Sequence, residues 1–138
     1  MSAAPIFYIT PRTAGAQCSA SAQTLKTVAG ADNTVSLITG AAGGSLITRV
    51  HIANAGTLGA SAANTARFYL LNSASYYLVA EIAIASITSS ASVAGFEADI
   101  PDCAGLILPD ANWSLRFGMS VNGATVDIYT ATVQVLDA

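Results

Sequence analysis

Apolar and small polar residues alternate with a period of two in short runs along most of the chain, and clusters of Gly, Asn, Ser and Pro separate these runs. A period of two places alternate side chains on opposite faces of a β-strand, and most apolar residues in the runs are β-branched or aromatic. Patterns with the period of a helix are nearly absent. We expect strands at residues 24–28, 34–38, 46–54, 64–72, 76–84, 93–100, 106–108, 113–121 and 124–135.

About eight strands at this spacing are typical of an all-β domain, an antiparallel β-sandwich or jelly roll. The length of 138 residues fits one such domain. Residues 1–22 offer few core anchors, so we expect an extended N-terminal arm over residues 1–22 and the sandwich over residues 23–138. The small-residue tracts at 55–64 and 85–94 are expected to be loops at the ends of the sandwich, with continuation of a strand as the alternative for the second.

Two hairpins can be predicted in register. Asn122-Gly123 is the strongest short-range signal for a two-residue type I′ turn, because both central residues of that turn need positive φ. The resulting hairpin pairs Met119 with Val126, Phe117 with Ile128 and Leu115 with Thr130. Beyond Tyr129 the apolar parity changes, which predicts a β-bulge near that residue.

The second hairpin joins residues 64–72 to residues 76–84. A two-residue loop would pair Phe68 with Val79 and turn Glu81 toward the core. A three-residue loop over 73–75 keeps Glu81 outside, opposite Arg67, so we predict the longer loop. Its register pairs Phe68 with Ala80 and Leu70 with Leu78.

Trp113, the only tryptophan, shares strand parity with Leu115, Phe117 and Met119. This parity predicts an inward, buried ring that closes the end of the core where Pro109 turns the chain. The alternative is an exposed platform for a sugar, as in a carbohydrate-binding module.

The composition favours an assembly over a solitary monomer with an uncharged surface. Hydrophobic residues make up 53% of the chain and charged residues 9%, whereas a typical soluble surface carries roughly 25–35% charged residues. A surface of Ala, Ser, Thr and Asn costs little to desolvate. The net charge of −3, with only five Lys and Arg residues, gives no basic cluster for nucleic acid, so we expect no nucleic-acid partner.

The cysteines, Cys18 and Cys103, match no zinc spacing and are expected to be reduced, which fits synthesis in a cytoplasm. Residues 1–12 lack the basic segment of a secretory signal. The longest apolar stretch, residues 76–87, is interrupted by Glu81 and is shorter than the ~18 residues of a membrane span, so no membrane partner is expected.

Candidate chemistry is sparse. His51, the only histidine, shares parity with Ile47 and Arg49, opposite to Leu46, Thr48, Val50 and Ile52, so we expect it on an outer or interface face. No Cys or carboxylate lies near it at ligand spacing, and no nucleophile elbow is present. Glu97, Asp99 and Asp102 could form a glycosidase-like pair, but their alternation with apolar residues predicts a solvated strand face. We therefore expect no enzyme activity, no cofactor and no metal.

The chain contains, in order, Gly43-Gly44-Ser45, Arg67-Phe68-Tyr69-Leu70, the strand from Tyr77 to Ile82 and the Leu-Pro turn from Leu106 to Arg116. This succession of segments resembles that of small structural proteins of tailed bacteriophage virions. The resemblance covers residues 24–136. It implies a jelly-roll virion component, often a capsid decoration or cement protein.

The expected function is to bind and stabilise the shell of the major capsid protein from its outer surface, as a homo-oligomer, trimer or dimer, made in the bacterial host cytoplasm. The alternatives are a neck or tail-fibre accessory protein, a carbohydrate-binding module, and a hydrolase that uses Glu97 or Asp99.

The expected partner interface includes Arg49, His51 and a short segment of the arm. That segment, Ile6, Phe7, Tyr8 and Ile9, is apolar on both faces, so we expect it to dock on a neighbouring copy or on the capsid protein. The alternative is that it forms the first strand of its own sheet.

Overall fold

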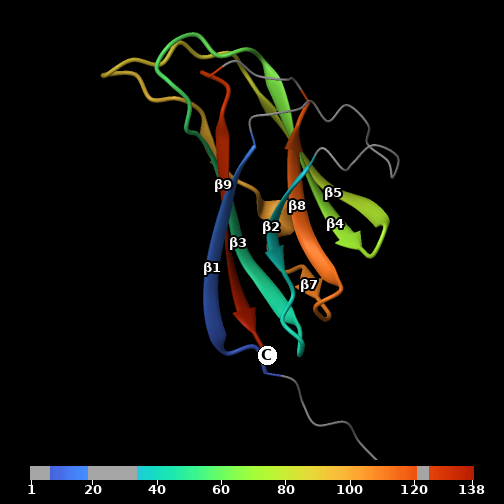
Figure 1. The fold of residues 1–138 in the computed structure, drawn as a ribbon. Coiled ribbons are helices and arrows are strands. Elements are labelled where there is room, and N and C mark those ends of the chain that lie inside the picture. Colours follow the sequence, from blue (N-terminus) through green and yellow to red (C-terminus); the bar gives the residue numbers. More distant parts are fainter. Residues whose placement is uncertain (1–6, 19–33, 121–124) are drawn as a thin grey trace, which may run out of the picture.

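The computed structural model describes residues 7–18, 34–120 and 125–138 and shows an antiparallel β-sandwich (Figure 1). The all-β prediction is confirmed. The described residues form nine strands and one short 3₁₀ helix, η2 (Pro101–Cys103). The strands are β1 (Thr10–Cys18), β2 (Val35–Thr39), β3 (Ser45–Asn54), β4 (Asn64–Asn72), β5 (Ser75–Ile84), β6 (Glu97–Asp99), β7 (Ile107–Leu108), β8 (Trp113–Met119) and β9 (Tyr129–Asp137).

The strands follow the order of a jelly roll. The five-stranded sheet has the order β1-β9-β3-β6, with β7 also paired to β3, and the four-stranded sheet has the order β2-β8-β4-β5. Apart from β7, the chain therefore behaves as one long hairpin rolled up around a core. Its tip is β4 and β5, and its arms pair β3 with β6, β2 with β8 and β1 with β9.

The core lies between the two sheets and is built from alternate residues of each long strand. Phe68 of β4 and Phe117 of β8 are fully buried, and their rings stack with centroids 5.8 Å apart. The five-stranded sheet contributes Val50 of β3 and Val133 of β9, which are also buried. Alternation with a period of two therefore selects the inner face on both sheets.

β1 corrects the predicted arm. Residues 10–18, which the sequence assigns to the arm over residues 1–22, pair along their whole length with β9. Small side chains face inward from this edge strand, where Ala14 and Ala16 pack against the core. Such residues give a weak strand signal, and Pro11 is tolerated because an edge strand leaves some N–H positions unpaired. The predicted strand at 24–28 lies outside the described residues.

The register predicted around Asn122-Gly123 is wrong, although the turn itself lies outside the described residues. Phe117 pairs with Val35 and Phe68 instead of Ile128. Both edges of β8 are occupied by β2 and β4, so the chain must cross to the other sheet to form β9. The predicted bulge is also absent, because Tyr129 is simply the first residue of β9 and its register with β1 is continuous.

The β4–β5 hairpin combines features of the two-residue and the three-residue loop considered for it. Arg67 lies opposite Glu81 and Phe68 opposite Ala80, as predicted. The turn is nevertheless the shorter one, since Asn72 pairs with Ser75, and Leu70 pairs with Tyr77 instead of Leu78. An irregularity at Val79 absorbs the extra residue, so Glu81 stays outside the core.

The two small-residue tracts form loops that meet at one end of the sandwich. Ala60 and Thr88 form an isolated bridge, and the backbone N–H of Ser61 donates to the carbonyl oxygen of Ile87 at 2.9 Å. These contacts hold the loops that follow β3 and β5 side by side. The opposite end of the sandwich, where β1 and β3 begin, carries the candidate site.

Candidate functional site

An apolar row crosses the outer face of the five-stranded sheet at the end where β1 and β3 begin, which is the lower end in Figure 1. Pro11 of β1 lies opposite Leu136 of β9, Leu136 opposite Leu46 of β3, and Leu46 opposite Ile107 of β7. Cross-strand partners share one face of a sheet, so these four side chains form a continuous strip. Pro11 is exposed, Ile107 is 46% exposed, and the two leucines are half-buried.

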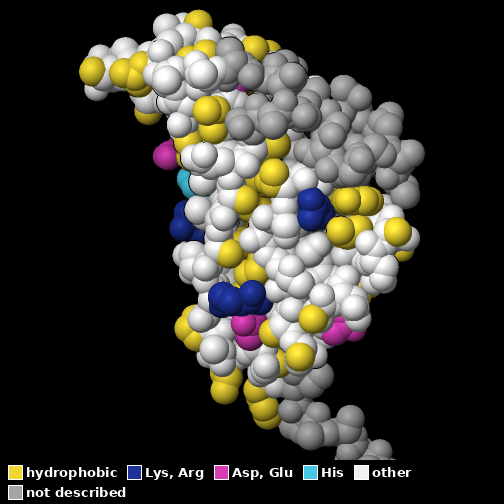
Figure 2. Space-filling model, viewed as in Figure 1, with side chains coloured by type: hydrophobic (Ala, Val, Ile, Leu, Met, Phe, Trp, Pro, Cys, Tyr) yellow, Lys and Arg dark blue, Asp and Glu magenta, His cyan; other side chains and the backbone are white. Residues whose placement is uncertain are grey.

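The arm extends this strip. The backbone N–H of Ile9 donates to the carbonyl oxygen of Asp137 at 3.0 Å, which continues the pairing of β1 with β9 by one residue. Phe7 and Ile9 have the strand parity of Pro11 and are 67% and 75% exposed. We call Phe7, Ile9, Pro11, Leu46, Ile107 and Leu136 the apolar patch. Figure 2 shows hydrophobic side chains at this end of the molecule, as it does at the opposite end.

The remaining arm residues are placed differently. Tyr8 has the opposite parity and is half-buried. Its hydroxyl lies beside Gly44, 3.4 Å from where a Cβ would stand. Ile6 lies outside the described residues. The described part of the arm is thus apolar and exposed on one face only.

Leu46 was missed by sequence reasoning because of a bulge in β3. The sequence parity places Leu46 on the inner face and Ile47 on the outer face, but the structure shows Ile47 fully buried. The register with β9 shifts between Ile47 and Arg49, so Thr48 is the extra residue and the parity changes there. No local signal in this segment marks the bulge.

Above the apolar patch the same face becomes polar, and its exposed side chains on β1 and β9 are uncharged. Thr13, Gln134 and Arg49 lie opposite one another on β1, β9 and β3. The next row contains Gly15, Thr132, His51 and Asp99. Thr13, Gly15, Thr132 and Gln134 are exposed, so this region is a shallow surface of small and uncharged groups.

A charged cluster closes this face at the β6 edge. Asp99 accepts from Arg49, with an Nη2–Oδ1 distance of 2.9 Å, and contacts Nδ1 of His51 at 2.8 Å. Glu97 lies 3.9 Å from the other ring nitrogen of His51. The hydrogen bond with His51, followed by that from Arg49, lowers the pKa of Asp99. In Figure 2 the single histidine lies beside a basic side chain at the edge of the view.

The structure therefore brings Phe7, Ile9, Arg49 and His51 onto one face, although they come from two separate segments. The expected solvated strand face is confirmed for Glu97 and Asp99, which are exposed on either side of Ala98. No group of three or more His, Cys, Asp or Glu residues in the described part of the chain is placed to hold a metal ion.

An ion pair fixes the strands beneath the apolar patch. Nε of Arg12 donates to Oδ2 of Asp137 at 2.8 Å, and Nη2 donates to Oδ1 at 3.1 Å. Nη2 also reaches the carbonyl oxygen of Thr39 at 2.9 Å, which ties β1 to the end of β2 in the other sheet. The bond from Arg12, assisted by one from Ser45, lowers the pKa of Asp137.

Trp113 lies at the end of the sandwich and packs against the core, but it is half-buried instead of buried. Its ring stacks with that of Tyr77, with centroids 6.2 Å apart and planes 22° apart, and Tyr77 is 51% exposed. Trp113 is therefore neither a fully enclosed core residue nor a free platform.

The cysteines do not supply a nucleophile. Cys18 and Cys103 are both buried and free, as expected for reduced cysteines. Burial, together with the charge of Asp102, raises the pKa of Cys103 to about 12, and burial also raises the pKa of Cys18. Because the thiolate is the reactive form, neither thiol is activated at neutral pH.

The described residues contain no helix with the length and hydropathy of a membrane span. No protein-family model matches the chain, and no curated protein matches it.

Among solved structures, a chain of the cyanophage Pam1 capsid asymmetric unit matches with a TM-score of 0.50 and 15% identity, over 100% of this chain and 92% of that chain. A chain of the infectious bursal disease virus VP2 subviral particle matches with a TM-score of 0.33 and 16% identity, over 92% of this chain and 32% of that chain. The cyanophage chain shares the overall fold of this protein.

Proposed function

We propose that this protein is a non-enzymatic structural component of a bacteriophage virion, which binds the outer surface of the major capsid protein shell as a decoration or cement protein. The apolar patch is the observation that carries the proposal. It places exposed side chains of the arm, β1 and β7 and half-buried leucines of β3 and β9 on one sheet face. The fold that this protein shares with a chain from a cyanophage capsid supports the same assignment.

The physical basis is burial of apolar surface at low desolvation cost. Each fully buried Ile or Phe side chain contributes about 1.5–3 kcal/mol relative to exposure. The polar rows next to the patch carry small uncharged groups, and the charges of Arg49 and Asp99 are already paired with each other. A partner can therefore cover these rows without leaving Arg49 or Asp99 as an unpaired buried charge. The protein acts as a dimer or trimer, so that each particle contact is repeated.

The test uses purified protein and capsid particles that lack it. Ile9→Ser and Ile107→Ser remove apolar area from the patch, whereas Leu58→Ser and Val93→Ser remove comparable area from loops at the other end. Leu58 is 65% exposed and Val93 48% exposed, which makes them matched controls. Binding is measured by co-sedimentation, and particle stability by the temperature at which the genome is released.

We expect each patch variant to weaken particle binding about tenfold, the equivalent of about 1.4 kcal/mol. The two control variants should bind as the wild type does. Wild-type protein that neither binds particles nor raises their release temperature contradicts the proposed function. Equal losses from patch and control variants contradict the assignment of the patch.

A further inference from the structure

The free edge of β5 offers a second contact. β5 is ten residues long and is the last strand of the four-stranded sheet, and among the described residues only β4 pairs with it. An edge strand presents N–H and C=O groups that can pair with a further extended segment. β5 has neither a proline nor a covering strand in the described structure to prevent this.

The register identifies which groups point outward. Asn72 and Ser75 flank a two-residue turn and therefore form a hydrogen-bonded pair. Antiparallel pairs alternate between hydrogen-bonded and non-hydrogen-bonded positions. Tyr76 and Leu78 hence occupy non-hydrogen-bonded positions, and their N–H and C=O groups point away from β4.

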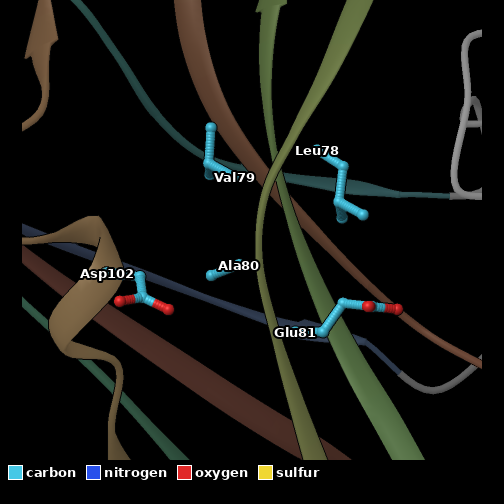
Figure 3. A pocket seen from close by; sticks show the side chains of 5 residues that line it. All are labelled: Leu78, Val79, Ala80, Glu81 and Asp102. Atoms are coloured by element: carbon cyan, nitrogen blue, oxygen red, sulfur yellow. The ribbon is translucent and has the colours of Figure 1, made fainter.

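A shallow groove runs along this edge. It is lined by Leu78, Val79, Ala80 and Glu81 of β5 and by Asp102 of η2, with a volume of about 350 Å³. In Figure 3 Asp102 extends from η2 toward the side of β5 that carries Ala80. Glu81 extends away from Asp102, on the other side of the strand. The groove thus joins an unpaired strand edge to one carboxylate.

The charge of Asp102 indicates which kind of side chain a bound segment would place in the groove. Glu81 is bonded to Arg67, with an Nε–Oε1 distance of 2.7 Å, whereas no described residue forms an ion pair with Asp102. The described arginines are already engaged, because Arg12, Arg49 and Arg67 form ion pairs and Arg116 donates to Thr34. The described part of a second copy therefore offers no spare arginine for Asp102, and the one lysine of the chain, Lys26, lies outside the described residues.

We propose that the β5 edge from Tyr76 to Ala80 accepts an extended segment of the capsid protein that places a Lys or Arg side chain against Asp102. The inference rests on the proposed function and adds a second attachment, on the sheet opposite the apolar patch. Backbone hydrogen bonds to the edge supply affinity, and the ion pair sets the register of the added strand.

The first test is independent of particles and uses two synthetic peptides, Thr-Val-Thr-Lys-Thr-Val-Thr and the same sequence with Glu in place of Lys. Titration of isotopically labelled protein is followed by amide chemical shifts. We expect the Lys peptide to shift the amides of β5 and η2. The Glu peptide should bind about two- to fivefold more weakly, as an exposed ion pair allows.

Three variants sharpen the result. Asp102→Asn should abolish the difference between the peptides, whereas Asp110→Asn, outside the groove, should preserve it. Leu78→Pro removes an outward N–H and should weaken both peptides. If Leu78→Pro does not fold, the difference in peptide binding by Asp102→Asn is the deciding measurement. Shifts that avoid β5, or equal binding of the two peptides to wild-type protein, overturn the inference.

The second test uses capsid particles. Particle binding by Asp102→Lys should be at least fivefold weaker than by wild-type protein. If Asp102→Lys binds particles as tightly as wild-type protein does, the edge contact is overturned and the proposed function stands. Failure of wild-type protein to bind particles, with the peptide selectivity intact, contradicts the proposed function and supports the edge as a site for basic strands.

Discussion

At the scale of single residues, Trp113 is the clearest case in which partial burial sets the size of an effect. Full burial of a Trp predicts a loss of about 3–5 kcal/mol on truncation to Ala. Trp113 is half-buried and shares its ring contact with the exposed Tyr77. We therefore expect Trp113→Ala to lower the free energy of unfolding by about 2 kcal/mol. Phe117 is fully enclosed, so Phe117→Ala should lower it by about 3–5 kcal/mol. Urea titration followed by circular dichroism measures both; equal losses contradict the prediction.

Asp137 makes stability depend on pH. Its pKa is lowered in the folded protein, first by the bond from Arg12 and then by that from Ser45. A carboxyl with a depressed folded pKa stabilises the fold above its unfolded pKa of about 3.9, and this contribution is lost as pH falls through the lower folded pKa. Asp137→Asn should therefore reduce stability at pH 7 and flatten its decline between about pH 5 and pH 2.

The measurement is thermal unfolding as a function of pH. Asp102→Asn is the control, because Asp102 is exposed and forms no ion pair with a described residue. The prediction fails if Asp137→Asn follows the wild-type pH profile, displaced by a constant amount.

At the scale of elements, the β4–β5 hairpin has one strained residue. Ser73, the first residue of its two-residue turn, has a φ of 56° and is the only non-glycine residue with positive φ in the described structure. A left-handed conformation costs a residue with a Cβ about 1–2 kcal/mol, whereas Gly adopts it freely.

Ser73→Gly should therefore raise the free energy of unfolding by about 0.5–1 kcal/mol. Ala74→Gly, in the same turn at negative φ, should lower it by about as much. Chemical denaturation of the two variants checks the difference in sign. A loss of stability in both would mean that the strain at Ser73 is not released by glycine.

At the scale of the whole molecule, β1 divides the N-terminal segment into two parts with different roles. Residues 7–9 carry part of the apolar patch, and the backbone bond from Ile9 to Asp137 ties them to the described part of the sheet. Residues 10–18 cover the edge of β9 and place Ala14 and Ala16 against the core. Deletion of residues 1–12 would also remove the Arg12–Asp137 ion pair.

We therefore expect deletion of residues 1–9 to lower the melting temperature by no more than about 5 °C, the equivalent of one lost hydrogen bond. The truncated protein should remain folded and lose particle binding. Deletion of residues 1–18 should prevent cooperative folding. Calorimetry separates the outcomes, and loss of the transition in the shorter deletion would place residues 1–9 within the fold.

The positions and inner faces of most strands were predictable from the sequence, because a period of two is a local property of each strand. Residues 64–72 match β4 in both bounds, and Arg67 and Glu81 were paired correctly across the nearest hairpin. The outer placement of Arg49 and His51 was also predictable, although their role in an interface remains a prediction.

Only the tertiary structure decided which distant strands pair. Asn122-Gly123 signals a turn but does not show whether β9 returns beside β8 or crosses to the other sheet, and the neighbours already flanking β8 settle that question. The small residues of β1 form a strand because β9 offers them an edge. Leu46 joins the apolar patch because the bulge at Thr48 reverses its face. Local alternation fixes the faces of a strand, whereas partners and bulges depend on packing between segments far apart in the chain.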